Sequence, residues 1–303
     1  MSEIMQFLET IFKPMVLAFT VSSLFAMGLQ VKMPEVIAAL KNKKAMALIF
    51  VWGWVLAPAL AYLITWVLPL AEPFVIAVLL SSLAPCAPIV PLMVAKARGD
   101  ISFAGAFIPL AMIGAVVFIP LIAPLMVKGV TISPWALAKP LLVSIFLPLA
   151  IGTAARHYAE TAAMKIFPAV NAFARLITLA MITVCFVLFA KPALGTVGSF
   201  ALLAATIHVV GMGLITYRFG FGLKQSQRSV MALGNGTRNM AAILVAAYAI
   251  PNMDPLIVTM VIMWGLWSFV LAAIGARIFA KQAGETVAGL GQTVVERRDR
   301  DTL

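Results

Sequence analysis

The chain has 303 residues, of which 63% are hydrophobic and only 11% are charged, and its mean hydropathy is +1.07. Soluble globular domains are about 45 to 50% apolar and about 25% charged, so this composition argues against a soluble enzyme and indicates an integral membrane protein. The net charge of +11 does not indicate a nucleic-acid partner, because the basic residues lie in short clusters between apolar runs, as in cytoplasmic loops. Both cysteines lie inside apolar runs, which leaves no disulfide framework or zinc motif.

Nine apolar stretches are long enough to cross about 30 Å of hydrocarbon as helices. They cover residues 14–31, 45–66, 73–95, 103–127, 134–155, 169–190, 197–217, 229–250 and 254–279. Before the first span, residues 1–13 place apolar side chains on one helical face, which predicts a short interfacial helix rather than a signal peptide. The tail 281–303 mixes glycine, threonine and charged residues and is predicted to be disordered and cytoplasmic.

The basic residues give the orientation, because cytoplasmic loops are enriched in lysine and arginine. Sixteen lie in or beside alternate loops, namely Lys32, Lys41, Lys43, Lys44, Lys96, Arg98, Arg156, Lys165, Arg218, Lys224, Arg228, Arg277, Lys281, Arg297, Arg298 and Arg300. The other side holds four, which are Lys13, Lys128, Lys139 and Lys191. The N-terminus is therefore predicted outside and the C-terminus inside. Arg175 and Arg238 lie within spans, whereas every carboxylate lies in or beside a loop.

Two of the predicted spans are interrupted. The third contains SSLAPCAPIVPLMV, with Pro85, Pro88 and Pro91 at a spacing of three, and each proline removes a backbone donor at about 3 kcal/mol in a helix interior. The eighth contains MALGNGTRNMAAILVAA, in which residues 234–239 place two glycines and four polar residues near the middle. Unwound backbone is tolerated in a bilayer only where it is buried in protein or lines a cavity.

The two interrupted spans stand five places apart, and an odd offset inverts orientation. The chain therefore reads as two inverted repeats, residues 1–127 and 128–280, in which the span at 134–155 lacks a counterpart. Interrupted helices at matching places in two repeats indicate the midplane binding site of a secondary transporter. The fold predicted is an all-α polytopic membrane protein with two broken crossing helices.

Several segments together resemble the bile acid:sodium symporter superfamily over about residues 20–280. They are FAMGLQVKMPE at the end of the first span, the proline-rich third span followed by ARGD, PLIAP, and GTRNMAAILVAA in the eighth. The resemblance implies inverted five-helix repeats with the first helix lacking here, a core domain holding both broken helices, a panel domain that rocks against it, and organic anion substrates. It also implies a bacterial-type member in the inner (cytoplasmic) membrane.

This chain departs from the resemblance at the sodium ligands. Those ligands are Ser, Asn and Thr on the family's fourth and fifth helices and Glu and Gln on its ninth, and the matching positions here are Val90, Pro91, apolar residues around 113–117, Gly234 and Arg238. Only the following Asn239 is kept. A hard cation needs about six oxygens, so no cofactor is expected and sodium coupling is not predicted.

Arg238 is the most informative candidate, because a buried arginine should face an anion or a cavity. It could hold a substrate carboxylate or sulfonate in a bidentate fork, or pair with carbonyls freed by the breaks. Arg175 is expected to reach the membrane interface. Beside Arg238, Asn235, Thr237 and Asn239 could cap the broken helix or bind substrate.

Three further residues are candidates in the apolar runs. Cys86 and Pro88 stand in the first break, where Cys86 is either a small apolar filler or a thiol for a soft substrate, as in the superfamily's arsenite exporters. His208 is either a hydrogen-bonded structural histidine or a proton-coupling group.

The sequence thus predicts a secondary transporter of a small organic anion acting by alternating access. An arsenite-type exporter and an anion-binding receptor that does not transport are the alternatives. An enzyme is not expected, because no nucleophile and base lie together at membrane depth. The predicted partners are the anion and the lipid bilayer, with no nucleic acid.

Overall fold

The computed structural model describes residues 3–126, 133–196, 198–251 and 253–300, apart from the side chains of residues 39, 193 and 285–300. These residues form helices and no strand, in agreement with an all-α membrane protein. Seven helical segments among them are long and apolar enough to cross a membrane. They are Glu3–Gly28 (α1), Lys43–Val67 (α3 Lys43–Phe50, η1 Val51–Leu56, α4 Ala57–Val67), Ile101–Met126 (α7), Pro134–Tyr158 (α8 Pro134–Leu141, η2 Leu142–Phe146, α9 Leu147–Tyr158), Glu160–Pro192 in α10 (Glu160–Leu194), Ala201–Arg218 (α11) and Pro255–Gly284 in α14 (Pro255–Arg300).

The two remaining predicted spans are each divided into half-helices. The first consists of α5 (Glu72–Ser82) and α6 (Val90–Lys96), and the second of α12 (Gln225–Gly236) and α13 (Met240–Tyr248). Both interruptions fall where proline or glycine and polar residues break the apolar pattern. That these half-helices also cross the bilayer, which would give nine spans, stays a prediction, as do the inverted repeats and their boundaries.

Several features differ from the sequence expectation at the helix ends. Residues 3–13 are the first turns of α1 rather than a separate interfacial helix. Helix α14 continues to Arg300, through the segment from Lys281 that the sequence predicts to be disordered, since no proline interrupts it there. A short helix, α2 (Met33–Lys41), follows α1.

Two of the long helices contain a π-helical turn that the apolar pattern does not reveal. These turns, η1 and η2, each end two residues before a proline, Pro58 or Pro148. Proline cannot donate the backbone hydrogen bond of a regular helix, so the wider turn accommodates the missing donor.

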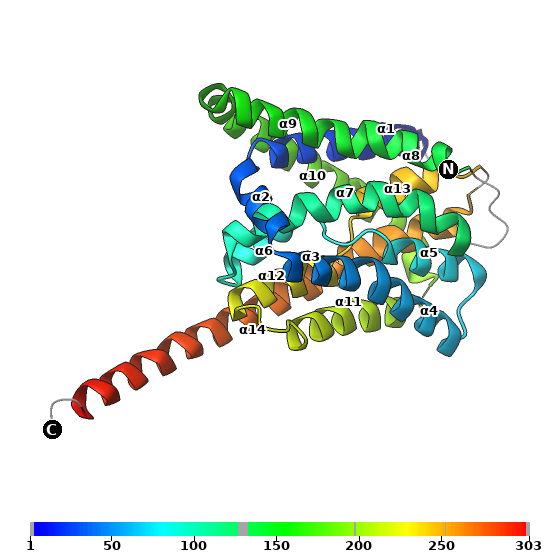
Figure 1. Cartoon of the computed structure of the whole chain (residues 1–303). Coiled ribbons are helices and arrows are strands. Elements are labelled where there is room, and N and C mark those ends of the chain that lie inside the picture. Colours follow the sequence, from blue (N-terminus) through cyan, green and yellow to red (C-terminus); the bar gives the residue numbers. More distant parts are fainter. Residues whose placement is uncertain (1–2, 127–132, 197, 252, 301–303) are drawn as a thin grey trace.

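The helices fall into two groups in Figure 1, where α1, α9 and α10 lie along the upper side. These three pack on one another, and we call them the panel. Helices α3 to α7 and α11 to α14 form the core around the four half-helices. In the panel, α1 and α9 cross at two glycines: a Cβ on Gly28 would lie 2.9 Å from the Cα of Gly152, and one on Gly152 would lie 3.0 Å from the Cα of Gly28.

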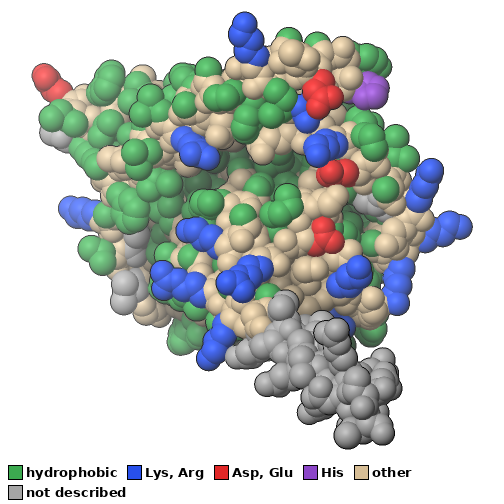
Figure 2. Space-filling view, turned by 90° about the vertical axis from the view of Figure 1, so that its left-hand side faces the viewer, with side chains coloured by type: hydrophobic (Ala, Val, Ile, Leu, Met, Phe, Trp, Pro, Cys, Tyr) green, Lys and Arg blue, Asp and Glu red, His purple; other side chains and the backbone are tan. Residues whose placement is uncertain are grey.

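Basic side chains gather on one face of the molecule. Figure 2 shows this face, on the side of α2, α6 and the projecting end of α14, with lysine and arginine around a hollowed centre. Two salt bridges of the described residues lie at helix ends, Lys32 to Glu35 in the first turn of α2 at 3.6 Å and Arg156 at the end of α9 to Glu160 at the start of α10 at 3.0 Å. The clustering in alternate loops therefore corresponds to one surface in three dimensions.

Candidate functional site at the crossing of the broken helices

The first break begins where α5 ends at Ser82 and lasts until α6 begins at Val90. Within it Cys86 has φ +72°, a left-handed conformation that costs a residue with a side chain about 1 to 2 kcal/mol. The side chain of Cys86 is fully buried, and Pro88 is half-buried. This backbone is thus held by its surroundings rather than by its own preference.

The second break is shorter and supplies its own caps. Helix α12 ends at Gly236, and the hydroxyl of Thr237 donates back to the carbonyl of Leu233 at 2.8 Å. Asn239 begins the next half-helix, because its Oδ1 accepts from the backbone N–H of Ala242 at 3.2 Å. Thr237 and Asn239 therefore have the capping role that the sequence left open against substrate binding.

The two breaks are paired directly through their backbones. The N–H of Cys86 donates to the carbonyls of Gly234 at 2.9 Å and Thr237 at 3.1 Å, and the N–H of Asn239 donates to the carbonyl of Ala84 at 2.8 Å. An isolated antiparallel bridge joins Pro85 to Arg238. These contacts satisfy part of the backbone that the breaks release from helical hydrogen bonding.

Arg238 links the two breaks through its side chain. Its Nη1 donates to the carbonyl of Ser82 at 3.2 Å, at the end of α5, and its Nη2 donates to the carbonyl of Asn235, in α12. The side chain has no exposed surface. Of the two interpretations of this arginine, the structure contains the pairing with freed carbonyls, which uses one N–H on each of Nη1 and Nη2 and leaves the Nε–H without a partner.

Unpaired polar atoms remain beside this arginine. The Nε of Arg238 and both side-chain atoms of Asn235 are buried without a hydrogen-bond partner. A Cβ built on Gly53, in η1, would lie 3.7 Å from Oδ1 of Asn235 and 3.5 Å from the ring of Pro85, so η1 faces this group. Buried polar groups are nearly always paired in proteins, which makes these atoms candidates to contact a ligand.

A comparison with protein families shows which family the chain belongs to. The model of the sodium bile acid symporter family matches residues 15–196, more than half of the chain and including the first break. The chain belongs to the sodium bile acid symporter family. No curated protein matches it. The protein is therefore an integral membrane protein of a transporter family rather than of an enzyme family, and it takes a small-molecule substrate in a lipid bilayer.

In the sodium bile acid symporter family, Gly234 matches a position expected to bind sodium and Asn239 follows another, and α7 places an apolar side chain against each of them. A Cβ on Gly234 would lie 2.1 Å from the ring of Phe107, so this ring fills the place of a longer side chain. The Nδ2 of Asn239 donates to the sulfur of Met112 at 2.9 Å. Helix α7 thus presents a ring and a thioether here rather than oxygens.

The remaining sequence candidates lie at different distances from the crossing. His208, on α11, is fully buried; its Nε2 donates to the carbonyl of Ala57 at 3.0 Å and its ring meets the edge of Trp264. This is the hydrogen bond expected of a structural histidine, and a coupling role stays a prediction. Arg175 is exposed on α10, away from both breaks.

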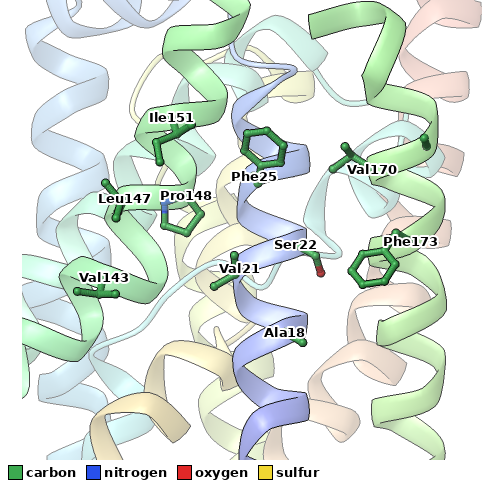
Figure 3. A pocket seen from close by; sticks show the side chains of 11 residues that line it. Ala18, Val21, Ser22, Phe25, Val143, Leu147, Pro148, Ile151, Val170 and Phe173 are labelled. Atoms are coloured by element: carbon green, nitrogen blue, oxygen red, sulfur yellow. The ribbon is translucent and has the colours of Figure 1, made fainter.

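Two of the hollows among the described residues lie outside the crossing. The larger, about 740 Å³, is a groove between α1, α9 and α10 with apolar walls from Val21, Leu147 and Phe173 (Figure 3). It offers no charged group to an anion, and none of its lining residues belongs to a broken helix. The smaller, about 360 Å³, includes Glu35 and Asp100, whose carboxylates would repel one.

Sequence reasoning missed the partners of the candidates. Ser82 contributes only a carbonyl oxygen, which no side-chain pattern reveals, and Phe107 and Met112 look like ordinary apolar residues of a span. The one available signal for η1 was the glycine of VWGWVL between two tryptophans.

Proposed function

We propose that this family member is a secondary transporter of a small organic anion that works by alternating access without sodium coupling. The observation that carries the proposal is the position of Arg238, which holds one carbonyl from each broken helix with a permanent positive charge. A sodium ion bound at such a crossing would also be held by oxygens. The guanidinium thus takes the place of a cation that would otherwise enter and leave.

The charge of Arg238 favours an anion as the substrate. The only acidic residue of the predicted spans is Asp254, at the first position of the ninth, and both salt bridges of the described residues lie at helix ends. Two carbonyl oxygens accept hydrogen bonds from the guanidinium but leave its net charge in place. An anion that enters the core would therefore gain electrostatic stabilisation that a neutral molecule would not.

The unpaired donors give the anion a place. The Nε–H of Arg238 and the Nδ2 of Asn235, three positions apart, both lack partners. Two donors suit a carboxylate or sulfonate, and charge-assisted bonds of this kind are shorter and stronger than neutral ones. In this proposal Cys86 and Pro88 shape the apolar wall, and Thr237 and Asn239 hold the half-helices in position.

Alternating access would arise from motion between the panel and the core. The described hydrogen bonds at the crossing come from the core, while α1 of the panel packs on α13, and α2 follows α1 and precedes α3, so it connects the two parts. We place the protein in a bacterial inner membrane with its N-terminus outside, because the basic face of Figure 2 then lies in the cytoplasm. The family match does not favour an arsenite exporter or a receptor.

The proposal is tested by anion flux in liposomes, with a panel of carboxylates and sulfonates. We expect Arg238→Gln to lower apparent affinity by about ten- to a hundredfold, since a hydrogen bond to a charged group contributes about 1.5 to 3 kcal/mol. Arg238→Lys should restore little, because an ammonium group cannot donate to two carbonyls in a plane. Arg175→Gln is the matched control and should transport normally.

Coupling is tested in the same liposomes by replacing sodium with potassium. Flux should not change, because the cation is built into the chain. Sodium-driven accumulation at a fixed stoichiometry would overturn the proposal of sodium independence. If flux depends on pH, His208→Gln should weaken that dependence only if His208 carries the proton.

A further inference from the structure

A structured turn between α11 and α12 exposes two aromatic rings at the basic face. Phe219 and Phe221 are 45% and 56% exposed, whereas Leu223, two positions later, is only 7% exposed. The N–H of Leu223 donates to the carbonyl of Gly220 at 3.0 Å, which closes the turn. Two phenylalanines are therefore turned outward by a segment that buries its leucine.

Several contacts fix the turn in this conformation. The Nε of Arg228 donates to the carbonyl of Leu223 at 3.0 Å, and its side chain packs so tightly on Gly220 that a Cβ there would meet it at 2.6 Å. Phe221 and Gly222 have φ of 37° and 89°. The exposed rings are thus a built feature of the fold.

The rings also touch the core below them. Phe221 stacks on Trp52 with ring centroids 6.2 Å apart and an angle of 11° between the planes, and it lies 6.0 Å from Phe219. Trp52 belongs to η1, inside the span Lys43–Val67, and a Cβ on Gly222 would lie 2.9 Å from Nζ of Lys44, at the start of that span, so the turn lies along the first part of the span. Phenylalanine side chains of interfacial segments insert at the boundary between headgroups and acyl chains.

Several cations lie around the turn, and the carboxylate of Asp100 lies beyond them at the first turn of α12, where it accepts from the Nε2 of Gln227 at 3.2 Å. The guanidinium of Arg218 lies 5.9 Å from the ring centre of Phe219, and a Cβ on Gly222 would lie 2.9 Å from Nζ of Lys44. Lys43 and Lys224 are exposed beside them. The sequence has no acidic residue at 36–71 or 161–253, and neither salt bridge of the described residues includes these cations.

We propose that this turn, residues 218–224 with Lys43 and Lys44, binds the phosphodiester headgroup of an anionic phospholipid. The cations would take the phosphate, and Phe219 and Phe221 would lie among the glycerol and upper acyl carbons. Basic groups beside interfacial aromatic rings select anionic over zwitterionic lipid, because the rings hold either lipid and only the charge distinguishes them. The proposal uses the orientation inferred above but not the substrate.

The experiment measures lipid retention by the purified full-length protein using native mass spectrometry. Dioleoylphosphatidylglycerol and dioleoylphosphatidylcholine share their acyl chains and differ in headgroup charge. We expect the native chain to retain the anionic lipid, dioleoylphosphatidylglycerol, in preference to the zwitterionic one. In Lys44→Gln/Arg218→Gln/Lys224→Gln the preference should fall about a hundredfold, since each basic side chain near an anionic surface contributes about a factor of five.

Matched variants distinguish a site from a general charge effect. Lys13→Gln/Lys139→Gln/Lys191→Gln removes the same charge from the opposite side and should keep the preference, as should the charge-preserving Lys44→Arg/Lys224→Arg. Phe219→Ser/Phe221→Ser should weaken retention of both lipids. Equal retention of both lipids by the native chain, equal losses in both neutralised triples, or displacement of the lipid by excess inorganic phosphate would overturn the proposal. None of these outcomes depends on anion transport.

Discussion

Cys86 has a backbone conformation that suits glycine better than any other residue. Replacement by glycine therefore removes the thiol while keeping the backbone conformation. We expect Cys86→Gly to change the free energy of unfolding by no more than about 1 kcal/mol, because relief of the left-handed strain offsets the loss of a small buried side chain. Cys86→Val should destabilise by more than about 2 kcal/mol, since β-branched residues are outliers at positive φ. Thermal unfolding in detergent measures both.

The same glycine variant tests the thiol. Anion flux by Cys86→Gly at the native rate would show that Cys86 is a filler. A folded Cys86→Gly protein that no longer transports would instead assign the sulfur a direct role.

Gly234 and Phe107 should be energetically coupled. A methyl group on Gly234 would lie 2.1 Å from the ring of Phe107, so Gly234→Ala is expected to cost about 1 to 3 kcal/mol by overpacking. In Phe107→Ala/Gly234→Ala the cost should be less than the sum of the single variants by about 1 kcal/mol or more. Additive costs in this double-mutant cycle would show that the ring moves aside freely.

Single residues were predictable from the sequence where they break a pattern. Arg238 is conspicuous as a charge in an apolar run, and Asn239 is conspicuous as a polar residue directly before an apolar helical segment. The partner of Arg238 was not predictable from the sequence, because Ser82 lies 156 positions away. Its carbonyl can accept from Arg238 only because α5 ends there, at the other break.

At the scale of elements, the crossing of α1 and α9 depends on Gly28 and Gly152. A Cβ on Gly28 would lie 2.5 Å from the carbonyl oxygen of Leu149, and backbone cannot turn away as a flexible side chain can. We therefore expect Gly28→Ala to lower the free energy of unfolding by about 2 to 3 kcal/mol. Gly275→Ala, whose nearest neighbour would lie at 3.8 Å, is the control and should be neutral or slightly stabilising. Equal melting temperatures for the two variants would contradict this account of the panel.

Breaks and π-helical turns differ in how far sequence predicts them. Three prolines in seven residues, or glycines followed by polar residues, leave no continuous helix, so both breaks were predictable. A lone proline is compatible with a regular helix, a kink or a π turn, and packing against other helices decides between these. Tertiary contacts therefore determine η1 and η2, which the apolar pattern could not reveal.

For the whole molecule, the basic face predicts the orientation. Glu72, at the start of α5, and Lys43, at the start of α3, are both exposed. We expect a membrane-impermeant maleimide to label Glu72→Cys in intact cells and Lys43→Cys only after permeabilisation. The native chain is the control, since Cys86 and Cys185 are both buried. The reverse pattern of labelling would invert the topology.

Composition and charge predict the class of the whole molecule because the bilayer constrains every span in the same way. They do not predict how the helices group into panel and core, since apolar side chains face lipid and protein alike. Phe107 and Leu125 illustrate this, because both are apolar residues of α7, yet one is 1% and the other 83% exposed.

The charge of Arg238 also determines which step of the proposed cycle responds to voltage. A sodium ion leaves with its substrate, whereas a guanidinium stays with the chain. When a monovalent anion is bound, its charge cancels that of Arg238, so the loaded site is neutral and crosses the electric field without electrical work. When the site is empty, it carries the one positive charge of Arg238. Moving that charge across the whole membrane potential changes its energy by about 2.3 kcal/mol per 100 mV. The membrane potential would then act on the return of the empty carrier and favour its inward-facing state.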